Sequence, residues 1–140
     1  MSLYLDASVI LPTLVVEAAS VQVETFLSGA TEPLWISEFA IAEVASGLSR
    51  LVRMGAMSST DADAALQDLD AWCAADIKMI EVDGSDARSA VVIVRRFELK
   101  LRAPDALHVA ICRRLGGQLV TLDRNLGSAA ASLGVLVVSP

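Results

Sequence analysis

The stretch LYLDASVI, residues 3–10, is an apolar run that carries an aspartate near its middle. Residues 3–5 have the pattern of a short buried strand, and Asp6 follows them directly. An ionised carboxylate is expensive to bury without a partner. Either Asp6 caps the backbone that follows it, or a positive charge belongs beside it. Ser8 places a small hydroxyl two residues further along.

Short β-prone runs alternate with longer helical patterns along the rest of the chain. We expect strands at residues 3–5, 34–36, 78–82, 118–122 and 135–138. We expect helices at residues 19–28, 38–54, 59–76, 85–97, from 103 to the glycines at 116–117, and 124–132. Thr60 and Asp63 have capping-box spacing at the start of the third of these helices.

This alternation of strands and helices predicts right-handed crossovers and a parallel sheet that helices cover on both faces. The predicted fold class is therefore α/β, a three-layer α/β/α domain with a central parallel sheet of about five strands. Nearly every connection is short, and no linker, repeat or low-complexity segment is present. We expect one domain over residues 1–140.

The composition fits a folded protein with a sizeable core, because 54% of the 140 residues are hydrophobic. No apolar run reaches the length of a membrane span, and no signal-type segment is present. We therefore expect a soluble cytoplasmic protein with no membrane partner. Cys73 and Cys112 lie in helical patterns without a CxxC motif, and His108 is the only histidine, which argues against a zinc site.

The charge of the chain is unevenly distributed. The net charge is −6, and residues 1–49 contain six acidic residues but no lysine or arginine. All eleven lysines and arginines come later in the chain. This balance argues against broad, nonspecific nucleic-acid binding, but it leaves room for a local basic patch.

Two aspartates follow predicted strands. In open parallel sheets, ligands bind at the carboxyl ends of the strands, near a switch point of the topology. Asp6 ends the first strand, and Asp123 ends the fourth in LVTLDRN, so both are expected at the same edge. Thr121 lies two residues before Asp123 and points to the same side. Each aspartate could instead cap the helix that follows it.

Two further acids lie in helical segments. Glu43, in FAIAEVASGL, is at the margin of an apolar face, so its side chain points either to solvent or to a site. Asp105, in RAPDALHVA, is in the first turn of a helix, where capping alone would also explain a carboxylate. His108 follows one turn later on the same face. We interpret this histidine as structural.

Four carboxylates that converge at one sheet edge would repel one another, and a hard divalent cation would remove that repulsion. Mg²⁺ and Mn²⁺ prefer such oxygen ligands, and the arrangement fits phosphodiester hydrolysis. The chain has no G-x-S-x-G elbow, P-loop or GxGxxG motif that would favour other α/β sites.

The motifs LDASVI, AEVASGL, RAPDALHVA and LVTLDRNL, in this order, resemble the PIN-domain ribonucleases. Within them, the chain looks like the VapC-type toxins of bacterial toxin–antitoxin pairs. The resemblance covers the whole chain and implies a PIN-like fold. It also implies that four acids hold Mg²⁺ or Mn²⁺ and cleave single-stranded RNA through a metal-activated water: Asp6, Glu43, Asp105 and Asp123.

The resemblance assigns supporting roles to other residues. Ser8 and Thr121 match the hydroxyl residues beside the acids, and Ser8 is expected to orient Asp6 or a metal-bound water. An ordinary helix N-cap is the alternative for Ser8, and the two can coexist. Arg124 is our first candidate for contact with the RNA backbone, although it could be a solvated loop arginine. Aromatic residues make up only 4% of the chain, so base-stacking platforms are scarce.

VapC-type toxins are typically homodimers, and a small VapB-type antitoxin neutralises them with a segment across the active-site groove. Residues 38–54 and 59–76 are apolar enough to expose a groove for such a segment, or those apolar residues belong to the core. The resemblance therefore implies RNA, an antitoxin and a second copy of the chain as partners.

Two other classes of α/β protein that place acids at strand ends fit the sequence less well. A receiver-type phosphoacceptor would need adjacent acids after the first strand and a late lysine, and no lysine follows Lys100. An aspartate-nucleophile phosphatase typically has D-x-D, and this chain has Ser8 at the second position. The sequence therefore predicts a metal-dependent endoribonuclease, with the role of a toxin as a second layer of the hypothesis. An RNA-processing PIN nuclease without an antitoxin and a non-catalytic PIN-like binding module stay as alternatives.

Overall fold

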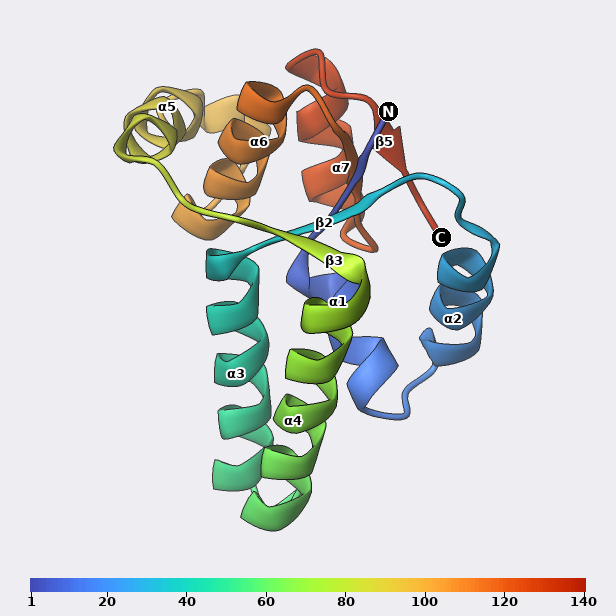
Figure 1. Cartoon of the computed structure of the whole chain (residues 1–140). Helices are drawn as coiled ribbons and strands as arrows, with labels where there is room; N and C mark the ends of the chain where they lie inside the picture. The colour runs from blue at the N-terminus through green and yellow to red at the C-terminus, as the bar shows by residue number, and fades with distance from the viewer.

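The computed structural model describes residues 1–140, and its centre is a five-stranded parallel sheet in the order β3-β2-β1-β4-β5 (Figure 1). The strands are β1 (Leu3–Leu5), β2 (Leu34–Ser37), β3 (Ile77–Ile80), β4 (Gln118–Val120) and β5 (Val137–Val138). Tyr4 of β1 pairs with Trp35 on one side and with Leu119 on the other. β1 is therefore the central strand, with β2 and β3 on one side of it and β4 and β5 on the other.

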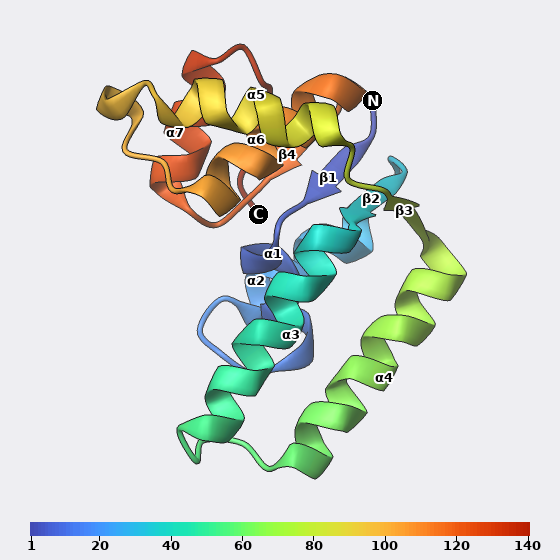
Figure 2. The same ribbon diagram turned by 90° about the vertical axis from the view of Figure 1, so that its left-hand side faces the viewer.

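Helices cover both faces of this sheet, which confirms the predicted three-layer α/β/α fold (Figures 1 and 2). One layer contains α1 (Ala7–Leu14), α2 (Ser20–Gly29), α3 (Glu38–Arg53) and α4 (Ser59–Asp76). The other contains α5 (Gly84–Val94), α6 (Ala103–Leu115) and α7 (Arg124–Ser132), with a short 3₁₀ turn, η1, at Phe97–Leu99. None of these helices combines the length and the apolar character needed to cross a membrane.

The two layers enclose two separate cores because successive side chains of a strand point to opposite faces. Tyr4 packs with the residues of α5, α6 and α7, whereas Leu3 and Leu5 pack with those of α1 to α4. All three side chains are buried. Consecutive residues of β1 thus pack against opposite helical layers. Asp6 follows directly after this strand.

The helices α3 and α4 form a long hairpin that extends beyond the sheet (Figures 1 and 2). The turn between them contains Gly55, whose φ of 72° is a left-handed conformation that glycine adopts without a steric penalty. Ser58 caps α4 by accepting a hydrogen bond from the Asp61 amide. The predicted capping box at Thr60 and Asp63 is therefore wrong, since the N-cap is Ser58, two residues before Thr60.

Several predicted ends also differ from the structure. The strand expected at 78–82 ends at Ile80, and the strand expected at 118–122 ends at Val120. The helix expected at 85–97 ends at Val94 and is followed by the 3₁₀ turn η1. A further helix, α1, begins directly after Asp6, where no helical range was assigned.

Candidate functional site

Asp6 is a buried carboxylate at the carboxyl end of β1, with only 4% of the residue exposed. The Ser8 hydroxyl donates a hydrogen bond to Oδ1 at 2.6 Å, and the Thr121 hydroxyl donates to Oδ2 at 2.6 Å. Asp6 precedes α1 but makes no side-chain capping bond to it. No lysine or arginine forms an ion pair with it. The capping explanation therefore does not account for this carboxylate.

Burial raises the pKa of Asp6, and the bonds from Ser8 and Thr121 offset part of that effect. The cause is desolvation, which disfavours the charged form of a buried carboxylate. Asp6 is thus a carboxylate whose local partners are neutral hydroxyls. A positive charge from outside the chain would therefore stabilise the ionised form of Asp6.

Hydroxyl groups connect Asp6 to Asp123 across neighbouring strands. Thr121 is buried, and its Oγ1 also accepts a hydrogen bond from the Asp123 amide at 3.0 Å. Ser8 lies inside α1 rather than at its N-cap, and its Oγ accepts from the Leu122 amide at 3.0 Å. The N-cap alternative for Ser8 is therefore excluded, while its contact with Asp6 is confirmed.

Asp123 is exposed and caps α7, because its Oδ1 accepts a hydrogen bond from the Leu126 amide at 3.0 Å. Capping and a place beside the Asp6 network therefore coexist at this residue. Arg124 follows as the first residue of α7 and is exposed. A surface hollow of about 220 Å³ is lined by Thr121, Asp123 and Arg124, among others.

Asp105 lies in the first turn of α6, where its side chain caps the backbone N–H of the N-cap residue, Arg102. Its Oδ2 accepts a hydrogen bond from the Arg102 amide at 3.2 Å, and the Arg102 Nε lies 3.5 Å away. The side chain is 15% exposed. Its other oxygen, Oδ1, is available for a further ligand.

Glu43 projects from α3 towards α6, where its carboxylate pairs with Nε2 of His108. The Glu43 side chain is 28% exposed, so it lies between core and solvent. His108 is buried, and its Nδ1 is hydrogen-bonded to the Tyr4 hydroxyl at 2.7 Å. Sequence reasoning missed this contact with Glu43, although His108 follows Asp105 by one helical turn.

The structure thus brings the predicted residues into two hydrogen-bonded groups. One contains Asp6, Ser8, Thr121 and Asp123, and the other joins Glu43 to His108 one turn after Asp105. No three His, Cys, Asp or Glu side chains have an arrangement that could hold a metal ion. Each of the four carboxylates instead accepts a hydrogen bond from a protein donor. That all four acids share one cation stays a prediction.

The donor set itself fits a hard divalent cation. All four acids offer carboxylate oxygens, which suit Mg²⁺ or Mn²⁺. A carboxylate has about four acceptor sites, so one protein hydrogen bond, or two at Asp6, leaves capacity for an ion. Both cysteines are remote from this chemistry, since Cys112 is buried in a hydrophobic core and Cys73 packs beside the other core.

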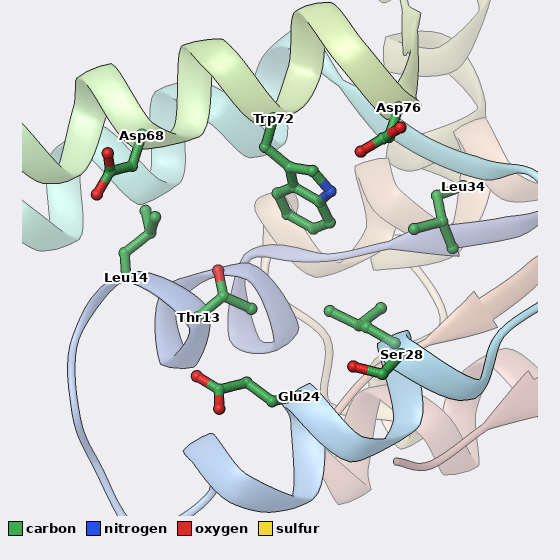
Figure 3. Close-up of a pocket in the computed structure, with 9 residues that line it drawn as sticks. Thr13, Leu14, Glu24, Ser28, Leu34, Asp68, Trp72 and Asp76 are labelled. Atoms are coloured by element: carbon green, nitrogen blue, oxygen red, sulfur yellow. The ribbon is translucent and has the colours of Figure 1, made fainter.

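The largest cavity, about 470 Å³, lies elsewhere, between α4 and the pair α1 and α2 (Figure 3). Trp72, Leu14 and Leu34 supply apolar walls, and three carboxylates line it as well: Glu24, Asp68 and Asp76. The apolar residues of α3 that were considered for a groove, such as Val44 and Leu48, are buried in the core. The 470 Å³ cavity beside α4 is therefore lined by residues of α1 and α2, and no residue of α3 lines it.

Comparison with known proteins gives matches that span the chain. A family model described as PIN domain matches residues 3–131. The curated protein Ribonuclease VapC3 of Pyrobaculum aerophilum is 33% identical over 137 residues, which cover 95% of this chain and 98% of that protein.

Two solved structures share the fold at low sequence identity. VapC20 of Mycobacterium tuberculosis, described as a Sarcin-Ricin loop cleaving toxin, has a TM-score of 0.75 at 18% identity and covers 99% of both chains. VapBC2 of Rickettsia felis, bound to a promoter DNA fragment, has a TM-score of 0.72 at 14% identity, with 99% of this chain and 98% of that chain covered.

Proposed function

This chain belongs to the PIN domain family, and from that premise we propose that it is a metal-dependent endoribonuclease that hydrolyses phosphodiester bonds in RNA. The observation that carries the proposal is Asp6, a buried carboxylate with hydroxyl partners and no cationic side chain in an ion pair. The relative named Ribonuclease VapC3 supports the same activity class.

In this proposal Mg²⁺ or Mn²⁺ would be held by Asp6, Glu43, Asp105 and Asp123. When bound, such a cation polarises the phosphate and lowers the pKa of water. Ser8 and Thr121 fix both oxygens of Asp6 before any ligand arrives, which reduces the reorganisation that binding requires. Arg124 is placed to hold an RNA phosphate beside the hollow at Asp123.

We further propose that the protein is the toxin of a type II toxin–antitoxin pair, a cytoplasmic homodimer that a VapB-type antitoxin neutralises. The relatives' names support this layer, since they include VapC proteins and a VapBC complex. Expression in a bacterial host should arrest growth, and coexpression of a small neighbouring reading frame should relieve the arrest. Growth without arrest, with RNA cleavage retained in vitro, would favour a processing nuclease that has no antitoxin.

Cleavage of a mixed RNA pool tests the nuclease activity. Wild type with Mg²⁺ or Mn²⁺ is compared with Asp6→Asn and Asp105→Asn, and with Asp63→Asn as the control, because Asp63 is exposed on α4. We expect cleavage by wild type and the control, and its loss in EDTA and in both site variants. Metal-independent cleavage that both site variants retain would contradict the proposal.

A non-catalytic PIN-like module predicts a different result from the same samples. It would cleave nothing, and the acids would not bind Mn²⁺ in a calorimetric titration. Mn²⁺ binding by wild type that Asp6→Asn abolishes would keep the nuclease proposal even when the pool lacks a suitable RNA.

A further inference from the structure

A chain of four hydrogen-bonded side chains runs through the interior to Glu43. The Ser37 hydroxyl is bonded to the Tyr4 hydroxyl at 2.8 Å, and the Tyr4 hydroxyl is bonded to His108 Nδ1 at 2.7 Å. His108 Nε2 is then paired with Glu43. Ser37 and Tyr4 are fully buried, and His108 is 2% exposed. Only the last member, Glu43, reaches the surface.

We propose that His108 is a positioning residue of the candidate site: held from behind by Tyr4 and Ser37, it fixes the Glu43 carboxylate for cation binding. This inference rests on the proposed function, because it gives Glu43 a cation to bind. It assigns His108 a role that differs from the purely structural role expected from the sequence.

One arrangement of protons that satisfies every bond of this chain starts at Ser37. The Ser37 Oγ accepts from the Ala40 amide at 3.0 Å as the N-cap of α3, so its own proton is free to go to Tyr4. Tyr4 in turn donates to His108 Nδ1, which leaves the proton on Nε2 to face Glu43.

Packing restrains the imidazole ring as well as its hydrogen bonds. The ring centroids of Phe39 and Tyr4 lie 5.4 Å and 5.7 Å from that of His108, both in tilted contacts. Three elements therefore hold His108, since Tyr4 is in β1, Phe39 is in α3 and the histidine is in α6. A ring held on this many sides has little rotamer freedom, and it transmits that order to the long side chain of Glu43.

An ordered Glu43 matters because a flexible glutamate would lose its freedom only when it binds a cation. Loss of a hydrogen-bond partner behind a metal ligand typically weakens metal affinity about 10–100-fold. His108 also comes from the same helix as Asp105, one turn away. Its contact with Glu43 therefore ties α3 to the helix that carries a second predicted ligand.

A double-mutant cycle on Mn²⁺ affinity tests the inference. His108→Phe keeps an aromatic ring between Phe39 and Tyr4 but removes both ring nitrogens, whereas His108→Gln keeps an N–H donor near the Nε2 position. We expect His108→Phe to weaken Mn²⁺ binding about 10–100-fold and His108→Gln to recover most of that loss. In a Glu43→Gln background, His108→Phe should have no further effect, because the group that it positions is gone.

The outcomes separate this inference from the function on which it rests. If wild type binds no Mn²⁺ and cleaves no RNA, the proposed function fails and the role of His108 fails with it. If wild type binds Mn²⁺ and folded His108→Phe binds it equally well, or if the two substitutions act additively, only the positioning role is overturned. Should His108→Phe not fold, Tyr4→Phe replaces it in the same cycle, because it removes the hydroxyl that supports Nδ1.

Discussion

Two buried aspartates in this protein have opposite partners. Asp86 is 1% exposed, and Arg114 donates two hydrogen bonds to it, from Nε to Oδ1 and from Nη2 to Oδ2, both at 2.7 Å. Asp6 is 4% exposed and has only the hydroxyls of Ser8 and Thr121. Asp86 therefore has a cationic side chain as its partner, whereas Asp6 forms no ion pair.

The pKa values of the two carboxyls move in opposite directions. Burial alone would raise both, and at Asp6 it does. At Asp86 the bonds from Arg114 and from the Asp83 amide outweigh burial and lower the pKa. Burial of a carboxylate therefore does not by itself indicate function. A buried carboxylate without a protein cation is the one that points to a ligand.

The two environments lie near opposite ends of α6. Arg114 comes from its last turn and reaches Asp86 in the first turn of α5, so this pair fastens two helices of one layer. Asp105 comes from the first turn of α6 and His108 from the next. One helix therefore carries a structural ion pair at its C-terminal end and part of the candidate site at its N-terminal end.

Replacing Asp6 should have the largest effect on activity. We expect Asp6→Asn to lower RNA cleavage by at least about a hundredfold, because loss of a direct ligand should exceed the usual loss of a supporting partner. The same change should leave the metal-free protein as stable as wild type or more so, since it removes a buried charge without a cation. Cleavage assays and urea unfolding in EDTA measure the two effects, and a large loss of stability would contradict the comparison.

Breaking the ion pair between Arg114 and Asp86 should mainly affect stability. Arg114→Ala leaves Asp86 buried without its cation and should lower the free energy of unfolding by about 2 kcal/mol, below the usual cost because the arginine side chain is 33% exposed. Urea unfolding measures this change. The adjacent Arg113→Ala is the control, since Arg113 is exposed. Equal stability of the two variants would show that the pair contributes little.

Acid should remove the contribution of Asp86 to stability. Because its pKa is lower in the folded protein, the unfolded chain takes up the proton first as pH falls. The stability that wild type gains over Asp86→Asn is therefore present above the ordinary aspartate pKa of about 3.9 and declines below it. Unfolding of both proteins between neutral and acidic pH tests this, and a difference that grows in acid would contradict it.

The smallest expected effect concerns RNA affinity. Arg124→Ala should weaken RNA binding modestly and reduce the slope of log affinity against log salt by about 1, as expected for one lost phosphate contact. Arg50→Ala is the control, because Arg50 is exposed in the last turn of α3, in the hairpin that extends beyond the sheet (Figure 1). Equal salt slopes for the two variants would remove Arg124 from the RNA surface.

Local patterns predicted the order of the strands and of every helix except α1 and the turn η1, because strands and helices bury their apolar residues with different periods. Strand ends were harder, since they depend on a distant partner. Val120 pairs with Leu5, the last residue of β1, and Ile80 pairs with Ser37, the last residue of β2. The helix expected to run to Phe97 ends earlier, and that side chain is 82% exposed rather than in the core.

The candidate site was predictable only in part for the same reason. Asp6 and Asp123 could be brought together from sequence because the carboxyl ends of neighbouring parallel strands share an edge. The pairing of His108 with Glu43 joins residues 65 positions apart on different helices. No local pattern encodes that contact, which depends on how α3 and α6 pack on either side of β1.

Mn²⁺ titration by calorimetry, with Asp6→Asn and Asp86→Asn as a matched pair of buried substitutions, tests whether the cation needs the buried aspartate that has no ion pair. We expect wild type and folded Asp86→Asn to bind Mn²⁺ with the same affinity and Asp6→Asn to lose binding. Equal binding by all three proteins would contradict this expectation, because the cation would then not need the one buried aspartate that the chain leaves without an ion pair.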